Sequence, residues 1–204
     1  MNPIITALLE RSSTNLFDSA RGLDDARIEE LVRLATTAPS AFNLQNWRFI
    51  AVRSSEAKAR LRAQAWDQAK VTEAAVTFIL VGQLADYRRL PERLMASVDA
   101  GFMPSEMVAG WQSAAQALYA DQPQRQRDEA VRSATFAGMT LVHAAQAYDL
   151  GASPMIGFDP EGVAQAFGLG PDEVPVMLLA VGYALDGNWP QKPRRPLAEV
   201  LSMV

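Results

Sequence analysis

The chain has no cysteine and a single histidine, His143, among its 204 residues. Without cysteine there can be no disulfide, no thiolate metal ligand and no cysteine nucleophile. One histidine cannot build a multi-histidine metal site, and this one sits in an apolar stretch where packing is a more typical role than general base. We therefore expect no metal and no catalytic side chain, so any chemistry needs a borrowed cofactor.

Long apolar runs and an excess of positive charge are also missing. The longest apolar stretches, 74–81 and 174–185, are far shorter than the roughly 20 residues of a membrane-spanning helix, and the N-terminus lacks the basic start and cleavage site of a signal peptide. Lys and Arg number 19 against 23 Asp and Glu, so no positive field exists to hold a nucleic-acid backbone. We predict a cytoplasmic protein that binds neither membrane nor nucleic acid.

The remaining composition is that of a globular protein. Hydrophobic residues make up 49% and charged residues 21%, which supplies a core and leaves little room for a disordered or fibrous chain. At this length one domain is the simplest organisation. We predict a single domain spanning residues 1–204.

Hydrophobic periodicity predicts a mixture of helices and strands. Asn2 and Pro3 resemble an N-cap and a first helical position, and Asp24 or Asp25 can cap a second helix. The unbroken apolar run in 75–81 predicts a central strand covered on both faces. Predicted helices cover 3–10, 25 to Pro39, about 55–71, 132–150 and 160–167, and predicted strands cover 47–52, 75–81, a segment after Gly151, and 174–183.

Two segments leave alternatives open. The region of about 86–126 mixes amphipathic helix with exposed-looking Met, Phe and Trp, which suits a variable helical pocket or lid, a subunit contact, or simple core packing. The C-terminal extension, about 185–204, is rich in proline but holds apolar side chains that are costly to leave in water. It can pack on its own chain or, as we favour, reach across a partner subunit.

Two polar segments are candidate ligand sites. Arg11-Ser12-Ser13 offers a guanidinium and hydroxyls beside backbone N–H groups, which are the donors that hold a phosphate. Residues 38–47 gather amide side chains that suit ring carbonyls and hydroxyls. A solvated loop and an ordinary Pro/Asn turn are the alternatives.

Residues 38–47 read Ala-Pro-Ser-Ala-Phe-Asn-Leu-Gln-Asn-Trp, which resembles the Ala-Pro-Ser-x-x-Asn-x-Gln-Pro-Trp signature of the FMN-dependent nitroreductase family. The resemblance covers nearly the whole chain and is weakest between about 86 and 126. It extends from Arg-Ser-Ser at 11–13 through Trp-Arg-Phe at 47–49, Pro-Met-Ile-Gly-Phe-Asp at 154–159 and Val-Gly-Tyr at 181–183 to Lys-Pro-Arg at 192–194.

The resemblance implies a nitroreductase-like α+β fold, in which helices flank a central, mainly antiparallel mixed sheet and a C-terminal tail extends over the partner subunit. It implies FMN as the cofactor, NAD(P)H as co-substrate, and a homodimer with FMN sites at the subunit interface. The FMN-binding residues that it implies are Arg11, Ser12, Ser13, Asn15, Pro39, Ser40, Ala41, Asn43, Gln45, Asp67, Lys70, Met155, Ile156, Gly157, Lys192 and Arg194.

The same resemblance implies roles within that set. Arg11, Ser13, Lys192 and Arg194 would hold the phosphate, and the 39–45 loop would come from the partner subunit to edge the flavin. Asp67 and Lys70, spaced i, i+3 on one face of the predicted helix, would meet the pyrimidine end of the ring, with a surface ion pair as the alternative. The backbone at Ile156 and Gly157 would place an N–H against flavin N5.

Three positions depart from the family pattern. Asn15 stands where a second Arg or Lys is usual, which would shift phosphate binding toward Arg194 or Arg195. Asn46 stands where proline is usual, and its freer φ would loosen the loop. Ile156 stands where Glu is common, which would make the pocket more apolar.

The implied function is hydride transfer from NAD(P)H through flavin N5 to a small oxidised acceptor, such as a nitroaromatic or a quinone, by a ping-pong mechanism. Three alternatives remain: a family reductase or dehydrogenase with a non-nitro substrate, a flavin- or small-ligand-binding protein without turnover, and a purely structural α+β domain. Bound yellow cofactor that bleaches with NAD(P)H distinguishes the enzymes from the other two.

Overall fold

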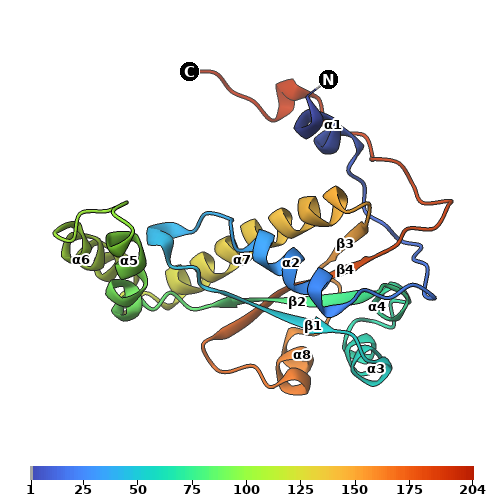
Figure 1. Cartoon of the computed structure of the whole chain (residues 1–204), viewed down its shortest axis with the longest axis horizontal. Coiled ribbons are helices and arrows are strands. Elements are labelled where there is room, and N and C mark those ends of the chain that lie inside the picture. Colours follow the sequence, from blue (N-terminus) through green and yellow to red (C-terminus); the bar gives the residue numbers. More distant parts are fainter. Residues whose placement is uncertain (1) are drawn as a thin grey trace.

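The computed structural model describes residues 2–204, which form a four-stranded sheet with helices on both faces (Figure 1). The strands are β1 (Trp47–Val52), β2 (Val76–Gln83), β3 (Gly151–Met155) and β4 (Glu173–Gly182), in the spatial order β1-β2-β4-β3. All three pairings among the described residues are antiparallel. The predicted strands and the α+β class are confirmed.

The helices lie in two layers. In Figure 1, α2 and α7 cover one face of the sheet, and α3 and α8 lie on the other. The helices of the described residues are α1 (Pro3–Glu10), α2 (Asp25–Ala35), α3 (Ser55–Gln64), α4 (Lys70–Glu73), α5 (Leu90–Asp99), α6 (Met107–Tyr119), α7 (Pro123–Ala147) and α8 (Pro160–Phe167), with 3-10 turns η1 (Ala41–Asn43), η2 (Tyr87–Arg89) and η3 (Leu197–Glu199).

β2 is the central strand that its apolar run predicts, and it is buried from Val76 to Gly82. Phe78 and Leu80 pack into the core that α2 and α7 cover, whereas Ile79 and Val81 pack into the core on the side of α3 and α8. Because successive side chains of a strand point to opposite faces, a strand between two cores is largely apolar. The buried polar residue of β2, Thr77, donates its hydroxyl to the Val71 carbonyl at 3.1 Å.

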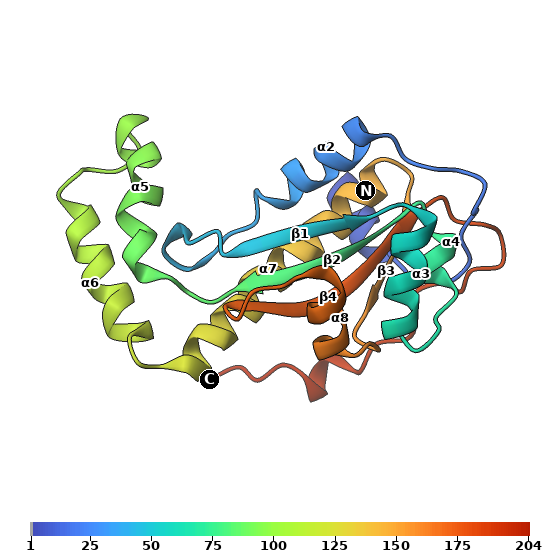
Figure 2. The same ribbon diagram turned by 90° about the horizontal axis from the view of Figure 1, so that it is seen from below.

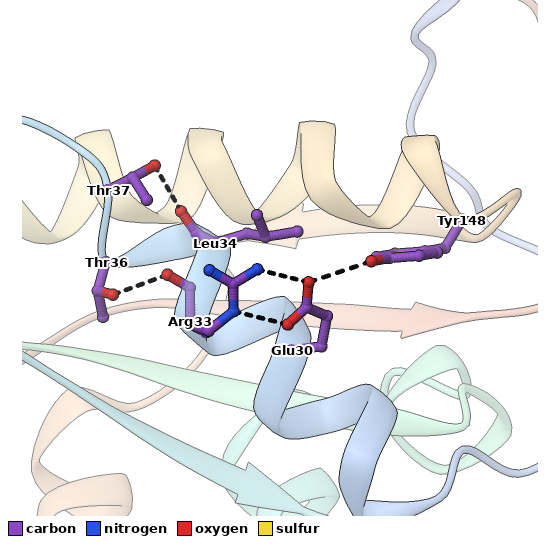
Figure 3. Close-up of polar contacts among 6 residues, drawn as sticks. All are labelled: Glu30, Arg33, Leu34, Thr36, Thr37 and Tyr148. Carbon is purple, nitrogen blue, oxygen red and sulfur yellow. Dashed lines mark hydrogen bonds and ion pairs between the residues drawn. The ribbon is translucent and has the colours of Figure 1, made fainter.

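α2 begins after Asp24, whose side chain accepts a hydrogen bond from a first-turn N–H at 2.8 Å. The helix ends at Ala35, four residues before Pro39, so the prediction that it continues to the proline is wrong. Thr36 and Thr37 explain the earlier end. Their hydroxyls donate to helix carbonyls three residues earlier, at 2.8 Å in both cases (Figure 3), which satisfies acceptors that a helix end leaves free.

The same helix is tied to α7 through Glu30 (Figure 3). The Glu30 carboxylate accepts two hydrogen bonds from Arg33, each at 2.7 Å, and one from the hydroxyl of Tyr148 at 3.2 Å, just beyond the end of α7. The hydrogen bond from Arg33 is the main cause that lowers the pKa of Glu30 below its usual value. This surface contact adds to the core packing of Ile28, Leu31 and Ala35, which holds α2 against α7 and the sheet.

The single helix predicted over about 55–71 is wrong. The chain instead forms α3 and the short α4, separated by Trp66 and Asp67 in the left-handed region, with φ of 51° and 55°. Two consecutive residues in that conformation cannot continue a right-handed helix. Neither residue is a glycine, so the sequence carries no obvious signal for the break.

α7 starts nine residues before the predicted Arg132, with Pro123 at its first turn. Proline suits that position because its missing N–H would have no partner there. The small residues of this helix lie against the sheet: a Cβ at Gly138 would come within 2.5 Å of Leu80 Cδ1. Gly138 therefore lets α7 approach β2 closely.

α1 and the C-terminal extension project together from the side of the molecule that carries α7 (Figure 1), while α5 and α6 lie at the end far from α3 and α4 (Figure 2). The boundaries predicted for α1 are confirmed, and the side chain of Asn2 caps it at 2.9 Å from Ile4 N–H. All large apolar side chains of α1 and the extension stay exposed in the described chain: Ile4, Ile5, Leu8, Leu9, Leu185, Trp189, Leu197, Val200, Leu201, Met203 and Val204. Packing on their own chain does not bury them.

Between residues 2 and 204, none of the helices has the length and the apolar composition that crossing a membrane requires.

Candidate functional site: a cationic cavity where the chain ends meet

The 11–16 loop leaves α1 and is fastened to the edge of the sheet. The N–H of Thr14 donates to a β3 carbonyl at 3.0 Å, and Phe17 forms an antiparallel bridge with Ala184 after β4. Gly151 permits this close approach, since a Cβ there would lie 2.4 Å from Thr14 Oγ1. The N-terminal and C-terminal segments are therefore side by side at this point.

A cavity of about 270 Å³ opens between this loop, Lys70 of α4, β3 and the C-terminal extension. Four cationic side chains line it, and in the described chain no carboxylate does. Converging cations without a counter-charge favour an anionic ligand. The lining residues are Arg11, Ser12, Ser13, Asn15, Lys70, Ser153, Pro154, Trp189, Pro190, Gln191, Lys192 and Arg194.

Backbone donors add to these charges. Within residues 2–204 the N–H groups of Ser12 and Ser13 have no hydrogen-bond partner. Successive free N–H groups beside hydroxyls and a guanidinium are a donor set that suits phosphate oxygens. The cavity therefore fits a phosphate-bearing ligand by charge and by hydrogen bonding.

Lys70 is the partly buried cation of the cavity. Its Nζ donates to Asn15 Oδ1 at 3.3 Å and to the hydroxyl of Ser153 at 3.2 Å. Burial is the main cause that lowers the pKa of Lys70 below its usual value, and the positive charge of Lys192 lowers it further. An anion in the cavity would favour the charged form of Lys70.

The structure brings together part of the predicted site. Asp67 is not in this cluster, because its carboxylate accepts from Arg62 at 2.7 Å and its backbone is left-handed. The prediction that Asp67 and Lys70 share one helix face is wrong, since Asp67 precedes α4. The predicted residues that do line the cavity are Arg11, Ser12, Ser13, Asn15, Lys70, Lys192 and Arg194.

The predicted segment Met155–Gly157 continues from the rim of this cavity, where Pro154 lies, but does not line it. The side chain of Met155 is buried in the core, whereas Ile156 is 81% exposed. The carbonyl of Gly157 accepts from Gln68 at 2.7 Å. The exposed Ile156 thus offers an apolar surface beside the charged cavity.

The predicted loop 39–45 lies at the far end of the sheet. It leads into β1, whose first residue, Trp47, pairs with Gly82 near the end of β2, while Lys70 lies just before the start of β2. The two sites are therefore separated by about the length of β2, roughly 26 Å. One chain does not bring Pro39, Ser40, Ala41, Asn43 and Gln45 to the cavity that Arg11 lines.

The loop has a defined conformation of its own. Phe42, Asn43 and Gln45 have positive φ of 53°, 54° and 47°, and the hydroxyl of Ser40 accepts from Gln45 N–H at 2.9 Å. Asn46, which we expected to loosen the loop, is buried and donates to the Gln83 carbonyl at 2.8 Å. That expectation is not met, because Asn46 anchors the loop to the end of β2.

Sequence reasoning missed several cavity residues. Ser153 is a buried strand residue with no motif around it, and only the pairing of β3 with β4 places it near Lys70. Gln191 lines the cavity from the extension without any periodic pattern, although its position beside Lys192 was an available signal. Asn188 does not line the cavity but holds the neighbouring loop through its backbone. His143, in contrast, is partly buried and lines a separate apolar cavity between α1 and α7.

The fold and the cavity define an α+β protein with a cationic cavity where its N-terminal and C-terminal segments lie side by side. Residues 8–183 match the model of the Nitroreductase family, and the chain belongs to that family. Among its relatives is a Bacillus subtilis protein provisionally named NAD(P)H nitroreductase YdgI, which is 31% identical over 92% of this chain and 91% of its own. A Thermus thermophilus protein named NADH dehydrogenase is 32% identical over 96% of this chain and 93% of its own.

A solved structure is also similar over the full length. It is an Exiguobacterium sibiricum protein, provisionally named a nitroreductase, in complex with FMN. It is 27% identical to this chain, covers 100% of this chain and 98% of its own, and superimposes with a TM-score of 0.91. The nitroreductase-like fold is thereby confirmed.

Proposed function

We propose that the chain is an FMN-dependent oxidoreductase that passes a hydride from NAD(P)H to a small oxidised acceptor by a ping-pong mechanism. The observation that carries this proposal is the cavity in which Arg11, Lys70, Lys192 and Arg194 converge without a carboxylate. The FMN bound to the similar Exiguobacterium protein and the nicotinamide donors in the relatives' names support it.

The cavity suits the phosphate end of FMN. Its charges and the free N–H groups of Ser12 and Ser13 match phosphate oxygens, and its volume of about 270 Å³ leaves the tricyclic ring to lie outside it. The exposed Ile156 and the neighbouring Gly157 offer an apolar surface for the ring at the cavity's rim. Met155 would act through its backbone, since its side chain is in the core.

A homodimer completes this site in the proposal. The 39–45 loop lies about the length of β2 from the cavity, so a second copy must supply it to the same flavin. This loop carries Pro39, Ser40, Ala41, Asn43 and Gln45. The exposed apolar side chains of α1 and the C-terminal extension are the surface on which that copy would pack, because leaving them in water is unfavourable by ~25 cal/mol per Å². Residues 1–204 act as one domain, with about 86–126 as lid and about 185–204 as the extension over the partner.

FMN, when bound, supplies the hydride chemistry at its N5. The chain itself binds the cofactor and provides the charges that surround it. Lys70, a partly buried cation held by Asn15 and Ser153, stabilises the negative charge that the bound cofactor brings into the cavity. The chain then needs no acid–base pair of its own.

The acceptor need not carry a nitro group. The Thermus relative is named NADH dehydrogenase, which supports a quinone or a similar acceptor as a second candidate within the same chemistry. The two candidates share the cofactor site and differ only in what binds over the ring.

The test is an absorbance spectrum of the purified protein after FMN is added and unbound flavin is removed. We expect a yellow protein that bleaches anaerobically with NADH or NADPH and regains its colour with a nitroaromatic or a quinone. A colourless protein would contradict the cofactor assignment. A yellow protein that no nicotinamide bleaches would be a flavin-binding protein without this activity.

A further inference from the structure

Two amide side chains, Asn188 and Gln191, tie the C-terminal extension to the 11–16 loop. We infer that they are positioning residues, which hold the cation of the loop and the cations of the extension around one cavity before any ligand binds. The inference rests on the proposed function, because it concerns the site that would take the FMN phosphate.

Asn188 makes four hydrogen bonds. Its Oδ1 accepts from the N–H groups of Asn15 at 2.7 Å and Leu16 at 3.0 Å, and its Nδ2 donates to the carbonyls of Leu16 at 3.0 Å and Leu185 at 2.9 Å. A side-chain amide has two donor hydrogens and two acceptor lone pairs. Because all four are used on the backbone, this side chain has no capacity left for a ligand.

Gln191 makes a second connection. Its Nε2 donates to the carbonyl of Arg11 at 3.0 Å and to that of Leu8, in the last turn of α1, at 3.2 Å. Both donor hydrogens of this amide are thereby used on the loop and on α1. Gln191 directly precedes Lys192, so this contact fixes the position of the first cation that the extension contributes to the cavity.

The contacts divide the donors of the loop into two groups. Asn188 uses the N–H groups of Asn15 and Leu16, whereas those of Ser12 and Ser13 have no partner within residues 2–204. The loop has no helix or strand of its own between α1 and Phe17, so the Asn188 contacts, together with the bond from Thr14 N–H to the Ala152 carbonyl, fix its backbone while leaving the Ser12 and Ser13 N–H groups available.

The charges around the cavity explain why the C-terminal extension must be tied to the 11–16 loop. Arg11 and Lys70 line the same cavity as Lys192 and Arg194 of the extension, and like charges gathered in one cavity repel one another. The lowered pKa of Lys70, in part due to Lys192, reflects that repulsion. The extension forms no regular structure between β4 and η3. Without Asn188 and Gln191 it would be free to carry Lys192 and Arg194 away from the cavity. Fixing them in advance reduces the cost of ordering on binding.

The experiment compares FMN with riboflavin, which lacks the phosphate. The dissociation constants of both are measured by flavin fluorescence for the wild type and for Asn188→Ala, Gln191→Ala and the double variant. The measured quantity is the ratio of the riboflavin constant to the FMN constant. We expect this ratio to fall about tenfold or more in the double variant and by smaller factors in the single variants, with the riboflavin constant changed less than twofold.

Gln124→Ala is the matched control, since Gln124 is an exposed amide in the first turn of α7 that donates to Asp128 at 2.7 Å, away from the cavity. We expect it to keep the wild-type ratio. If the double variant loses thermal stability but keeps that ratio, the two amides are merely structural and the inference is overturned. If the double variant does not fold, the same criterion is applied to Gln191→Ala, which removes only the two contacts to the Leu8 and Arg11 carbonyls. Failure of the wild type to bind FMN would instead reject the proposed function.

Discussion

The ammonium group of Lys70 lies 3.2 Å from the buried hydroxyl of Ser153, although 83 residues separate them. The contact joins α4 to β3 and, with the contact to Asn15, holds a partly buried positive charge at the base of the cavity. A cation held in this way costs stability unless an anion compensates it. This relationship makes Lys70 the most sensitive test of the anion site.

FMN affinity should depend on pH through Lys70. Burial and the charge of Lys192 lower its pKa below 10.5 in the free protein, and a bound phosphate favours its charged form. The FMN dissociation constant should therefore rise as pH increases through that lowered pKa, because binding then requires proton uptake. Titrations from about pH 7 to about pH 9.5 measure this slope, which Lys70→Gln should flatten while weakening binding overall.

Lys58→Gln is the control for the pH dependence. Lys58 also has a pKa lowered by burial, but its Nζ donates to the Ala74 and Thr72 carbonyls and does not line the cavity. This variant should keep the wild-type slope. An unchanged slope in Lys70→Gln would mean that Lys70 does not sense the ligand.

Arg11→Ala should weaken FMN binding and leave the oligomeric state unchanged. A hydrogen bond to a charged group contributes about 1.5–3 kcal/mol, which corresponds to a roughly 10- to 150-fold higher dissociation constant. Fluorescence titration and light scattering measure the two properties. Arg125→Ala, on the exposed start of α7, should change neither. Equal affinity of the Arg11 variant and the wild type would reject the phosphate assignment.

Removal of residues 189–204 should abolish both flavin retention and the dimer. The deletion takes away Gln191, Lys192 and Arg194 of the cavity together with the exposed apolar side chains of the extension. Light scattering and absorbance of the purified protein measure the two losses. A shorter deletion, of residues 202–204, keeps the cavity and should remain yellow. A monomer that stays yellow after the longer deletion would contradict the proposed extension over the partner.

Gly82→Ala should lower the free energy of unfolding. A Cβ at this position in β2 would lie 2.4 Å from the Ala130 carbonyl oxygen of α7. Because that atom belongs to the backbone, sheet and helix must move apart, at a cost of about 1–3 kcal/mol. Urea denaturation measures this change. Gly110→Ala is the control: it lies on α6 with no atom within 4 Å of its Cβ, so it should be neutral or stabilising by up to ~1 kcal/mol.

Much of the fold could be predicted because its signals are local. Asn2 with Pro3 marks the start of α1, and Asp159 with Pro160 marks the start of α8, which ends at Gly168 in the left-handed conformation. The uninterrupted apolar run of β2 predicts its central place. Caps, turns and the period of hydrophobic residues depend on a few neighbouring residues, so they are readable from the amino-acid sequence.

The sequence by itself determined the strands, most of the helices, the family signature and the cations of the cavity, because residue type and spacing carry that information. Only the tertiary structure decided that Asn188 and Gln191 connect the chain ends, that Ser153 meets Lys70, that Trp66 and Asp67 break the helix, and that the 39–45 loop lies a sheet length from the cavity. These features depend on which distant segments pair in the sheet. Strand pairing and loop closure are set by the free energy of the whole chain, and no local pattern records them.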